Sequence, residues 1–143
     1  IEKKHRIEDA LEAVRAAQEE GVVPGGGCAL ARAAKKMIVT TVGESPDFHP
    51  DQMSGVNVVM VACQEPLRQM ALNAGESPDL IIAEILSTKA PTGWDFRRGQ
   101  VVNLIDKGII DPVKVTRTAL QNAASCAGTL LTTNFGIIQR EDN

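Results

Sequence analysis

The sequence has no tyrosine, and aromatic residues make up only 3% of its 143 residues. Hydrophobic residues nevertheless account for 43% of the chain, so the core has to be built from Ala, Val, Ile and Leu, which pack well between helices. The length suits one domain of ordinary size that buries roughly two-thirds of its unfolded surface. A mainly α domain is therefore expected.

The chain also lacks an excess of one charge and a long apolar run. Its 15 basic and 18 acidic residues are spread along the sequence and leave a net charge of -3. Since no basic stripe is present to neutralise phosphates, nucleic acid is not an expected partner. No run approaches the roughly 18 to 20 apolar residues of a membrane span, and no signal-peptide pattern opens the chain, so no membrane partner is expected either.

Cysteines are few and show no metal-binding or disulfide pattern. Cys28, Cys63 and Cys126 are far apart, form no C-x-x-C pair and have no nearby histidine. Each lies among apolar residues, which is typical of reduced, buried thiols. This usage predicts a cytosolic or organelle-matrix protein.

The first half of the chain shows helical periodicity interrupted by a glycine-rich turn. Apolar residues recur every three or four positions over residues 2–20, and Gly21 is expected to end this amphipathic helix. The turn 21–27 contains Gly25, Gly26 and Gly27, and a second helical pattern follows over residues 28–37. Gly, Ser and Pro predict an exposed loop over residues 42–51.

The middle of the chain predicts short helices followed by a hairpin. An apolar stripe over residues 56–63 precedes a helix that has Pro66 near its start and ends at 73–75. A further helix is expected over residues 78–87, capped by Ser77. Turn residues between 91 and 99, followed by Gln-Val-Val, predict a small β-hairpin.

The last third predicts the longest helix and a lone strand. Asp111-Pro112 opens a helix whose apolar residues keep a 3.6-residue period for about 20 residues. Residues 135–139 have strand propensity, and the sequence supplies no partner for them.

The residues alone leave the candidate site undecided. The turn at Gly25, Gly26 and Gly27 would let a ligand approach the backbone, yet it is neither a P-loop nor a dinucleotide fingerprint, and a plain helix-helix turn is the favoured interpretation. Asp111 is interpreted first as a helix N-cap, although a ribose-binding carboxylate would show the same pattern. Asp9 cannot be told from the other acids of its helix, and no complete catalytic site is visible.

Several motifs, taken in order, resemble one known family. They are RIEDAL at 6–11, RAAQEEGVVPGGGCAL at 15–30, EPLRQ at 65–69, NAG at 73–75, DKGIIDPVKVTR at 106–117 and ALQNAAS at 119–125. Together they resemble the group I chaperonins, the GroEL family, in the C-terminal part of the equatorial, ATP-binding domain. The resemblance covers nearly the whole chain.

The resemblance implies a subunit of an ATP-driven folding ring. Residues 1–143 would be the C-terminal portion of the equatorial domain, with the apical and intermediate domains and the N-terminal equatorial part, including the phosphate loop, lying upstream. The whole protein would be an ATPase that assists the folding of non-native polypeptides inside a chamber. It would use ATP with Mg²⁺, and K⁺ as an optional further ion. The expected partners are a homo-oligomeric heptameric ring, unfolded polypeptides and a co-chaperonin.

The resemblance also assigns roles to individual residues. Asp9 corresponds to the acid that positions the attacking water, and Gly25 and Gly26 correspond to backbone against the ribose and base. Asp111 corresponds to the carboxylate that bonds the ribose hydroxyls, and Ile109 to an apolar contact with adenine. No residue of this chain corresponds to a metal ligand.

The adenine-side hairpin departs from the family pattern. The family usually has Tyr-Asn-Ala where this chain has Trp94, Asp95 and Phe96. An amide that both donates and accepts is thereby replaced by a carboxylate that only accepts, and a small residue is replaced by a ring. Asp95 and Phe96 are still expected at the cofactor, but their contacts with adenine are open.

Further expectations follow from the resemblance. The segment 135–139 would pair with strands of the missing N-terminal segment and of a neighbouring subunit. A cytoplasmic location is expected, with an organelle matrix or a viral origin as alternatives. The 143 residues supply the ribose and adenine side of an ATP site and its hydrolytic acid, so they are expected to be inactive alone.

Two other functions remain open from the sequence. One is a stand-alone helical interaction module that derives from a chaperonin and has no ATPase activity, which the substitutions at Asp95 and Phe96 favour. The other is an unrelated metabolic enzyme that uses the glycine turn for a phosphate, which the lack of a second catalytic group disfavours.

Overall fold

The structure is a computed structural model that describes residues 2–44 and 49–138. Within these residues it has six helices and four short strands. The helices are α1 (Glu2–Glu20), α2 (Cys28–Glu44), α3 (Pro50–Ala62), α4 (Glu65–Asn73), α5 (Pro78–Ser87) and α6 (Val113–Leu131). The strands are β1 (Val22–Pro24), β2 (Thr92–Asp95), β3 (Gln100–Asn103) and β4 (Ile110–Pro112).

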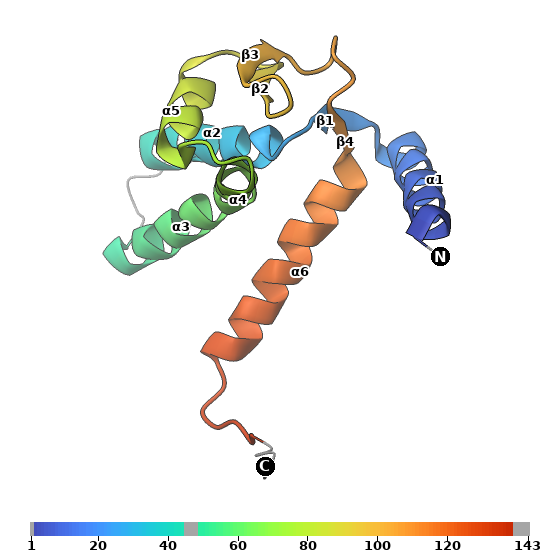
Figure 1. The fold of residues 1–143 in the computed structure, drawn as a ribbon. Coiled ribbons are helices and arrows are strands. Elements are labelled where there is room, and N and C mark those ends of the chain that lie inside the picture. Colours follow the sequence, from blue (N-terminus) through green and yellow to red (C-terminus); the bar gives the residue numbers. More distant parts are fainter. Residues whose placement is uncertain (1, 45–48, 139–143) are drawn as a thin grey trace.

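The elements gather into a helical body with two helices extending from it. Helices α2 to α5 lie together beneath the β2–β3 hairpin, while α1 and the long α6 leave from the other side, where β1 and β4 pair (Figure 1). Among residues 2–44 and 49–138, none of the helices combines the length and the hydrophobicity that a membrane span requires. The mainly α class and the small hairpin predicted from the sequence are confirmed.

The core is aliphatic, as the lack of aromatic residues predicted. Leu67, Ile85 and Leu104 are completely buried, together with the first residue of α2, Cys28. Burying each of the three aliphatic side chains contributes about 2 kcal/mol to folding. The two larger rings of the region, Trp94 and Phe96, are only partly buried and pack against the outside of this cluster.

A pairing that the sequence did not suggest joins two segments that are far apart along the chain. Strand β1 lies antiparallel to β4, with Val22 opposite Pro112, Val23 opposite Asp111 and Pro24 opposite Ile110. Two backbone bonds extend this ladder, from Gly25 N to Ile109 O at 2.9 Å and from Val113 N to Gly21 O at 3.1 Å. The glycine turn that follows β1 is thereby fixed against β4.

Close packing explains why the turn needs glycine at two positions. A Cβ on Gly25 would lie 3.1 Å from the carbonyl of Ile109, and one on Gly27 would lie only 2.8 Å from the backbone nitrogen of Leu67. Both contacts are between parts of this chain. Packing within the chain therefore explains why glycine is required at Gly25 and Gly27, without any contact with a ligand.

The predicted role of Asp111 as a helix N-cap is wrong. Helix α6 begins at Val113, its N-cap residue is Pro112, and no side chain caps it. Asp111 lies in strand β4 because the ladder with β1 holds its backbone extended. The carboxylate is therefore not engaged by the start of the helix.

Two other boundaries also differ from the prediction. Helix α2 continues to Glu44 and α3 begins at Pro50, so the loop predicted over 42–51 is shorter; residues 45–48 lie outside the described residues. Residues 134–138 form no strand, and Phe135, Ile137 and Ile138 are 90% or more exposed. An isolated segment has no ladder to complete its hydrogen bonds. Gln139, the last residue of the predicted strand, lies outside the described residues.

The turn glycines provide a test of this packing. Gly26 and Gly27 both have positive φ, but a Cβ on Gly26 would meet nothing within 4 Å. We expect Gly26→Ala to lower the free energy of unfolding by about 1 kcal/mol through backbone strain alone. Gly27→Ala adds a clash with α4 and should cost about 3 kcal/mol. Urea unfolding of both variants measures the difference, and equal losses would contradict the packing explanation.

Candidate functional site

The β1–β4 ladder brings four of the predicted site residues together. Gly25 bonds to the carbonyl of Ile109, and Asp111 lies opposite Val23 in the ladder that leads into the turn. Gly26 borders open space, whereas Gly25 is buried. Ile109 and Asp111 are half-buried and so remain accessible from one side. A glycine backbone, an apolar side chain and a carboxylate thus meet at one edge of the fold.

The start of α2 lies against the same place. Burial raises the pKa of the Cys28 thiol, and the nearby charge of Asp111 raises it further, while a backbone bond at Trp94 and the charge of Arg32 oppose the shift. Asp111 lies opposite Val23 in the ladder, two residues before the glycine turn begins at Gly25. A buried thiol whose pKa is raised is a poor nucleophile, so Cys28 is a packing residue.

Asp9 lies apart from these residues, in a groove between α1 and α6. The groove has a volume of about 620 Å³. Its lining includes Asp9, Glu12 and Ala16 of α1, Val115 and Ala119 of α6, and Pro112 of β4. Pro112 directly follows Asp111 in β4, so one end of the groove borders the strand that carries the second acid.

Ion pairing distinguishes Asp9 from the neighbouring acids, which the sequence could not do. Glu8 pairs with Lys4 at 3.4 Å and Glu12 with Arg15 at 2.8 Å. In the described part of the chain no cation pairs with Asp9. Its carboxylate is exposed at the groove and remains able to accept a hydrogen bond from water.

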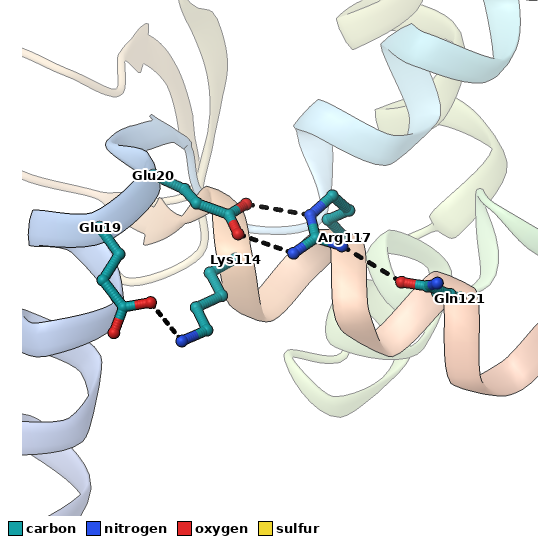
Figure 2. A network of polar contacts seen from close by, with 5 residues as sticks. All are labelled: Glu19, Glu20, Lys114, Arg117 and Gln121. Atoms are coloured by element: carbon teal, nitrogen blue, oxygen red, sulfur yellow. Dashed lines mark hydrogen bonds and ion pairs between the residues drawn. The ribbon is translucent and has the colours of Figure 1, made fainter.

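A network of charges joins α1 to α6 beside this groove (Figure 2). Arg117 donates to both oxygens of Glu20, from Nε at 3.0 Å and from Nη2 at 2.7 Å, and Lys114 pairs with Glu19. Arg117 also donates to the amide oxygen of Gln121 at 3.2 Å. The bond from Arg117 lowers the pKa of Glu20, and the same bond raises the pKa of Arg117.

This network was not predicted from the sequence. The residues that form it can be found in the sequence. Two adjacent acids, Glu19 and Glu20, end one predicted helix, and two cations three residues apart, Lys114 and Arg117, lie near the start of another. Only the pairing of β1 with β4 shows that these two helix ends are adjacent. No residue of α1 is buried, so these ion pairs add to a shallow packing of α1 against α6 and β4.

Asp95 stabilises the turn of the β2–β3 hairpin by hydrogen bonds, and Phe96 packs against the aliphatic core. Asp95 is 5% exposed, and its Oδ1 accepts the backbone N–H groups of Arg97 at 3.0 Å and Arg98 at 3.3 Å. Its Oδ2 lies 3.6 Å from the guanidinium of Arg98. Phe96 packs against the same aliphatic cluster as Ile109. Phe96 and Ile109 thus each border the same buried cluster, while the Asp95 carboxylate bonds to the hairpin itself.

The described residues contain no group of three or more His, Cys, Asp or Glu side chains arranged to hold a metal ion. The three thiols are unpaired with one another, since Cys28 and Cys63 are buried in separate clusters and Cys126 is exposed on α6.

The sequence model of the TCP-1/cpn60 chaperonin family matches residues 1–141 of this chain. The chain belongs to this chaperonin family. The family assignment made from the motifs is therefore confirmed.

A solved structure supports the same fold. A crystal structure of a group III chaperonin in the open state is similar with a TM-score of 0.74 and 28% sequence identity over 85% of this chain. The match covers 25% of that chaperonin, so the present chain spans about a quarter of its length. The similarity to a group III protein leaves the assignment to group I as a prediction.

The Glu20–Arg117 pair predicts a pH-dependent stability. Because the folded pKa of Glu20 is lowered, its contribution is fully present above the unfolded value of about 4.3 and is lost as the pH falls through the folded value. The stability difference between the unmodified protein and Glu20→Gln should therefore be largest near neutral pH and shrink below about pH 4. Urea unfolding across this range measures it.

Glu12→Gln is the matched control, because Glu12 pairs with Arg15 inside α1 and does not join α1 to α6. If the loss of unfolding free energy in Glu20→Gln stayed constant from neutral to acidic pH, the ion pair between Glu20 and Arg117 would not be its cause.

The hairpin gives a second stability prediction. Asp95→Ala removes the acceptor for two backbone donors and should cost about 2 kcal/mol of unfolding free energy. Asp95→Asn keeps an oxygen in the same place and should cost less than about 1 kcal/mol. Thermal or urea unfolding compares the two, and equal losses would show that the turn does not depend on this oxygen.

Proposed function

We propose that this chain forms the ribose and base side of the ATP site of a chaperonin subunit, together with the acid that promotes hydrolysis. The observation that carries the proposal is the β1–β4 ladder, which gathers Gly25, Gly26, Ile109 and Asp111 at one edge of a chain of the chaperonin family. In the whole protein, ATP hydrolysis would drive the folding of non-native polypeptides.

Each residue group suits one part of a nucleotide. Gly26 offers backbone beside open space, and the half-buried carboxylate of Asp111 suits the two hydroxyls of a ribose, which are donors. Ile109 offers an apolar surface to a base. Asp9 suits the orientation of an attacking water, because its carboxylate is exposed in the groove and unpaired with a cation in the described residues.

The remaining parts of the proposal concern the whole protein. The phosphates and Mg²⁺, with K⁺ as an optional further ion, would be held by residues outside this chain, since the described residues hold no metal-binding cluster. We include in the proposal a group I assignment, a heptameric ring, a co-chaperonin and a cytoplasmic location. Native mass spectrometry of the full-length subunit tests the ring size directly.

Replacement of Asp9 tests the hydrolytic role. In the full-length subunit, Asp9→Ala should lower the rate of ATP hydrolysis at least about a hundredfold while nucleotide affinity changes little, because water activation is lost and binding is not. Phosphate release and equilibrium binding measure the two quantities. Glu12→Ala, which removes a paired acid from the same groove, should leave hydrolysis nearly unchanged. Equal effects of the two variants would overturn the role of Asp9.

Replacement of Asp111 tests the ribose contact. Asp111→Ala should weaken ATP binding by about tenfold or more, since it removes charge-assisted hydrogen bonds to the sugar. Asp106→Ala, an exposed acid of the turn before β4, is the matched control and should bind as the unmodified protein does. A 2′-deoxy nucleotide should lose less affinity in Asp111→Ala than in the unmodified protein. Unchanged ATP binding by Asp111→Ala would overturn the assignment.

The interaction module without ATPase activity is the alternative, favoured by the engagement of Asp95 within its own hairpin. A full-length subunit that binds no nucleotide at millimolar concentration would establish this alternative over the proposed ATPase.

A further inference from the structure

A small apolar pocket lies between α2 and α3, with α6 at one side. It has a volume of about 100 Å³. In the described part of the chain, every side chain that lines it is an Ala, Val, Leu, Met or Cys. None of these side chains carries an oxygen, a nitrogen or a charge. The side-chain atoms of the lining that can bind a metal are therefore the sulfurs of Met37, Met60 and Cys63.

Two of these three residues are neighbours on one face of α3. Met60 and Cys63 are three residues apart, and Cys63, which follows the helix, keeps helical backbone angles of φ -65° and ψ -16°. Side chains at this spacing have Cβ atoms about 5–6 Å apart. Both residues are 7% exposed and share a buried cluster with Ala34 of α2. Met37 follows Ala34 by three residues, so the third sulfur comes from the facing helix.

The surroundings of Cys63 differ from those of the other two thiols. Cys28 belongs to a buried cluster in which no methionine takes part, and Cys126 is exposed on α6. Methionine side chains are flexible and fill irregular gaps, so ordinary packing would be expected to close a space of this kind. The pocket that Met37, Met60 and Cys63 line is nevertheless open.

Thioether and thiolate sulfurs select soft metal ions, and Cu(I) above all. Hard cations such as Mg²⁺ and Ca²⁺ require oxygen ligands, which the lining side chains do not supply. Cu⁺ bound to a single thiolate forms a neutral unit, so an apolar pocket can hold it without burying a net charge. Chemically, the pocket thus suits Cu(I) better than the divalent metals.

The binding step is a ligand exchange in which no electron is transferred. Burial raises the pKa of the Cys63 thiol, so this thiol is protonated at neutral pH when no metal is bound. Formation of the Cu–S bond releases the thiol proton to solvent. Met37 is 39% exposed, so it offers a path by which the ion reaches the buried sulfurs.

We propose that this pocket is a binding site for Cu(I), held by the Cys63 thiolate and the thioether sulfurs of Met37 and Met60. The inference goes beyond the proposed function and does not depend on it, because none of the lining side chains belongs to the proposed ATP site.

Titration of the full-length subunit with Cu(I) tests the site. The reduced protein, kept free of oxygen, competes for Cu(I) with the coloured chelator bathocuproine disulfonate. Cys63→Ala should bind one Cu(I) fewer per subunit than the unmodified protein, since it removes the only thiolate of the pocket in the described residues. Taking the difference between the two proteins cancels any Cu(I) bound by sulfurs elsewhere in the subunit.

Met60→Leu tests the thioether contribution with little change in volume. The variant should keep the pocket apolar and weaken Cu(I) binding by about tenfold, because one soft ligand is lost. Met70→Leu is the matched control, since Met70 lies in α4 and does not line the pocket. It should bind Cu(I) as the unmodified protein does. X-ray absorption of the bound Cu(I) should show sulfur neighbours only.

The pH dependence gives an independent signature of the thiol. In the described residues no other titratable side chain lines the pocket, so the Cu(I) affinity lost in Cys63→Ala should rise about tenfold per pH unit between about pH 6 and pH 8.

Each result decides for or against the site. Equal Cu(I) stoichiometry in the unmodified protein and in Cys63→Ala overturns the proposal, as do nitrogen or oxygen neighbours of the bound ion. Should Cys63→Ala fail to fold, as judged by circular dichroism, Met60→Leu provides the decision. Cu(I) affinity that is unchanged in Met60→Leu, or lowered equally in Met70→Leu, overturns the proposal.

Discussion

The antiparallel pairing of β1 with β4 is the constraint on which the rest of the arrangement depends. Each strand has only three residues, yet the ladder joins the end of α1, the glycine turn, the start of α2 and the start of α6. Because side chains alternate along a strand, a slip of one residue would turn Asp111 to the opposite face. The backbone bond from Gly25 to Ile109 extends the same register into the turn.

Two kinds of contact hold the helices, and they respond differently to conditions. Helices α2, α4 and α5 share a buried apolar cluster that contains Cys28, Leu67 and Ile85. Helix α1 has no buried residue and is joined to α6 by the pairs of Glu19 and Glu20 with Lys114 and Arg117 (Figure 2). Exposed ion pairs weaken with salt and with protonation, whereas apolar burial does not. The arrangement of α1 and α6 around the groove that contains Asp9 should therefore depend on salt concentration and pH.

The same residue types carry different tasks at neighbouring places. Asp111 and Asp95 are both acids on short strands, but the first is half-buried at the glycine turn and the second is buried beneath the backbone of its hairpin. Likewise Gly26 borders open space, while Gly25 and Gly27 are required by contacts within the chain. The type of residue alone did not reveal its role. The role depends on which of its atoms are already bonded or packed within the chain and which remain open to a ligand.

The sequence by itself determined the aliphatic core, the helices, the hairpin and, through its ordered motifs, the chaperonin family. These features depend on local periodicity, on turn residues and on composition, all of which act over a few neighbouring positions. Tertiary structure alone decided that Asp111 belongs to a strand and not to a helix cap, and that 134–138 form no strand. Three-residue strands carry too few side chains to show a period, and a hydrogen-bond partner far along the chain leaves no local pattern.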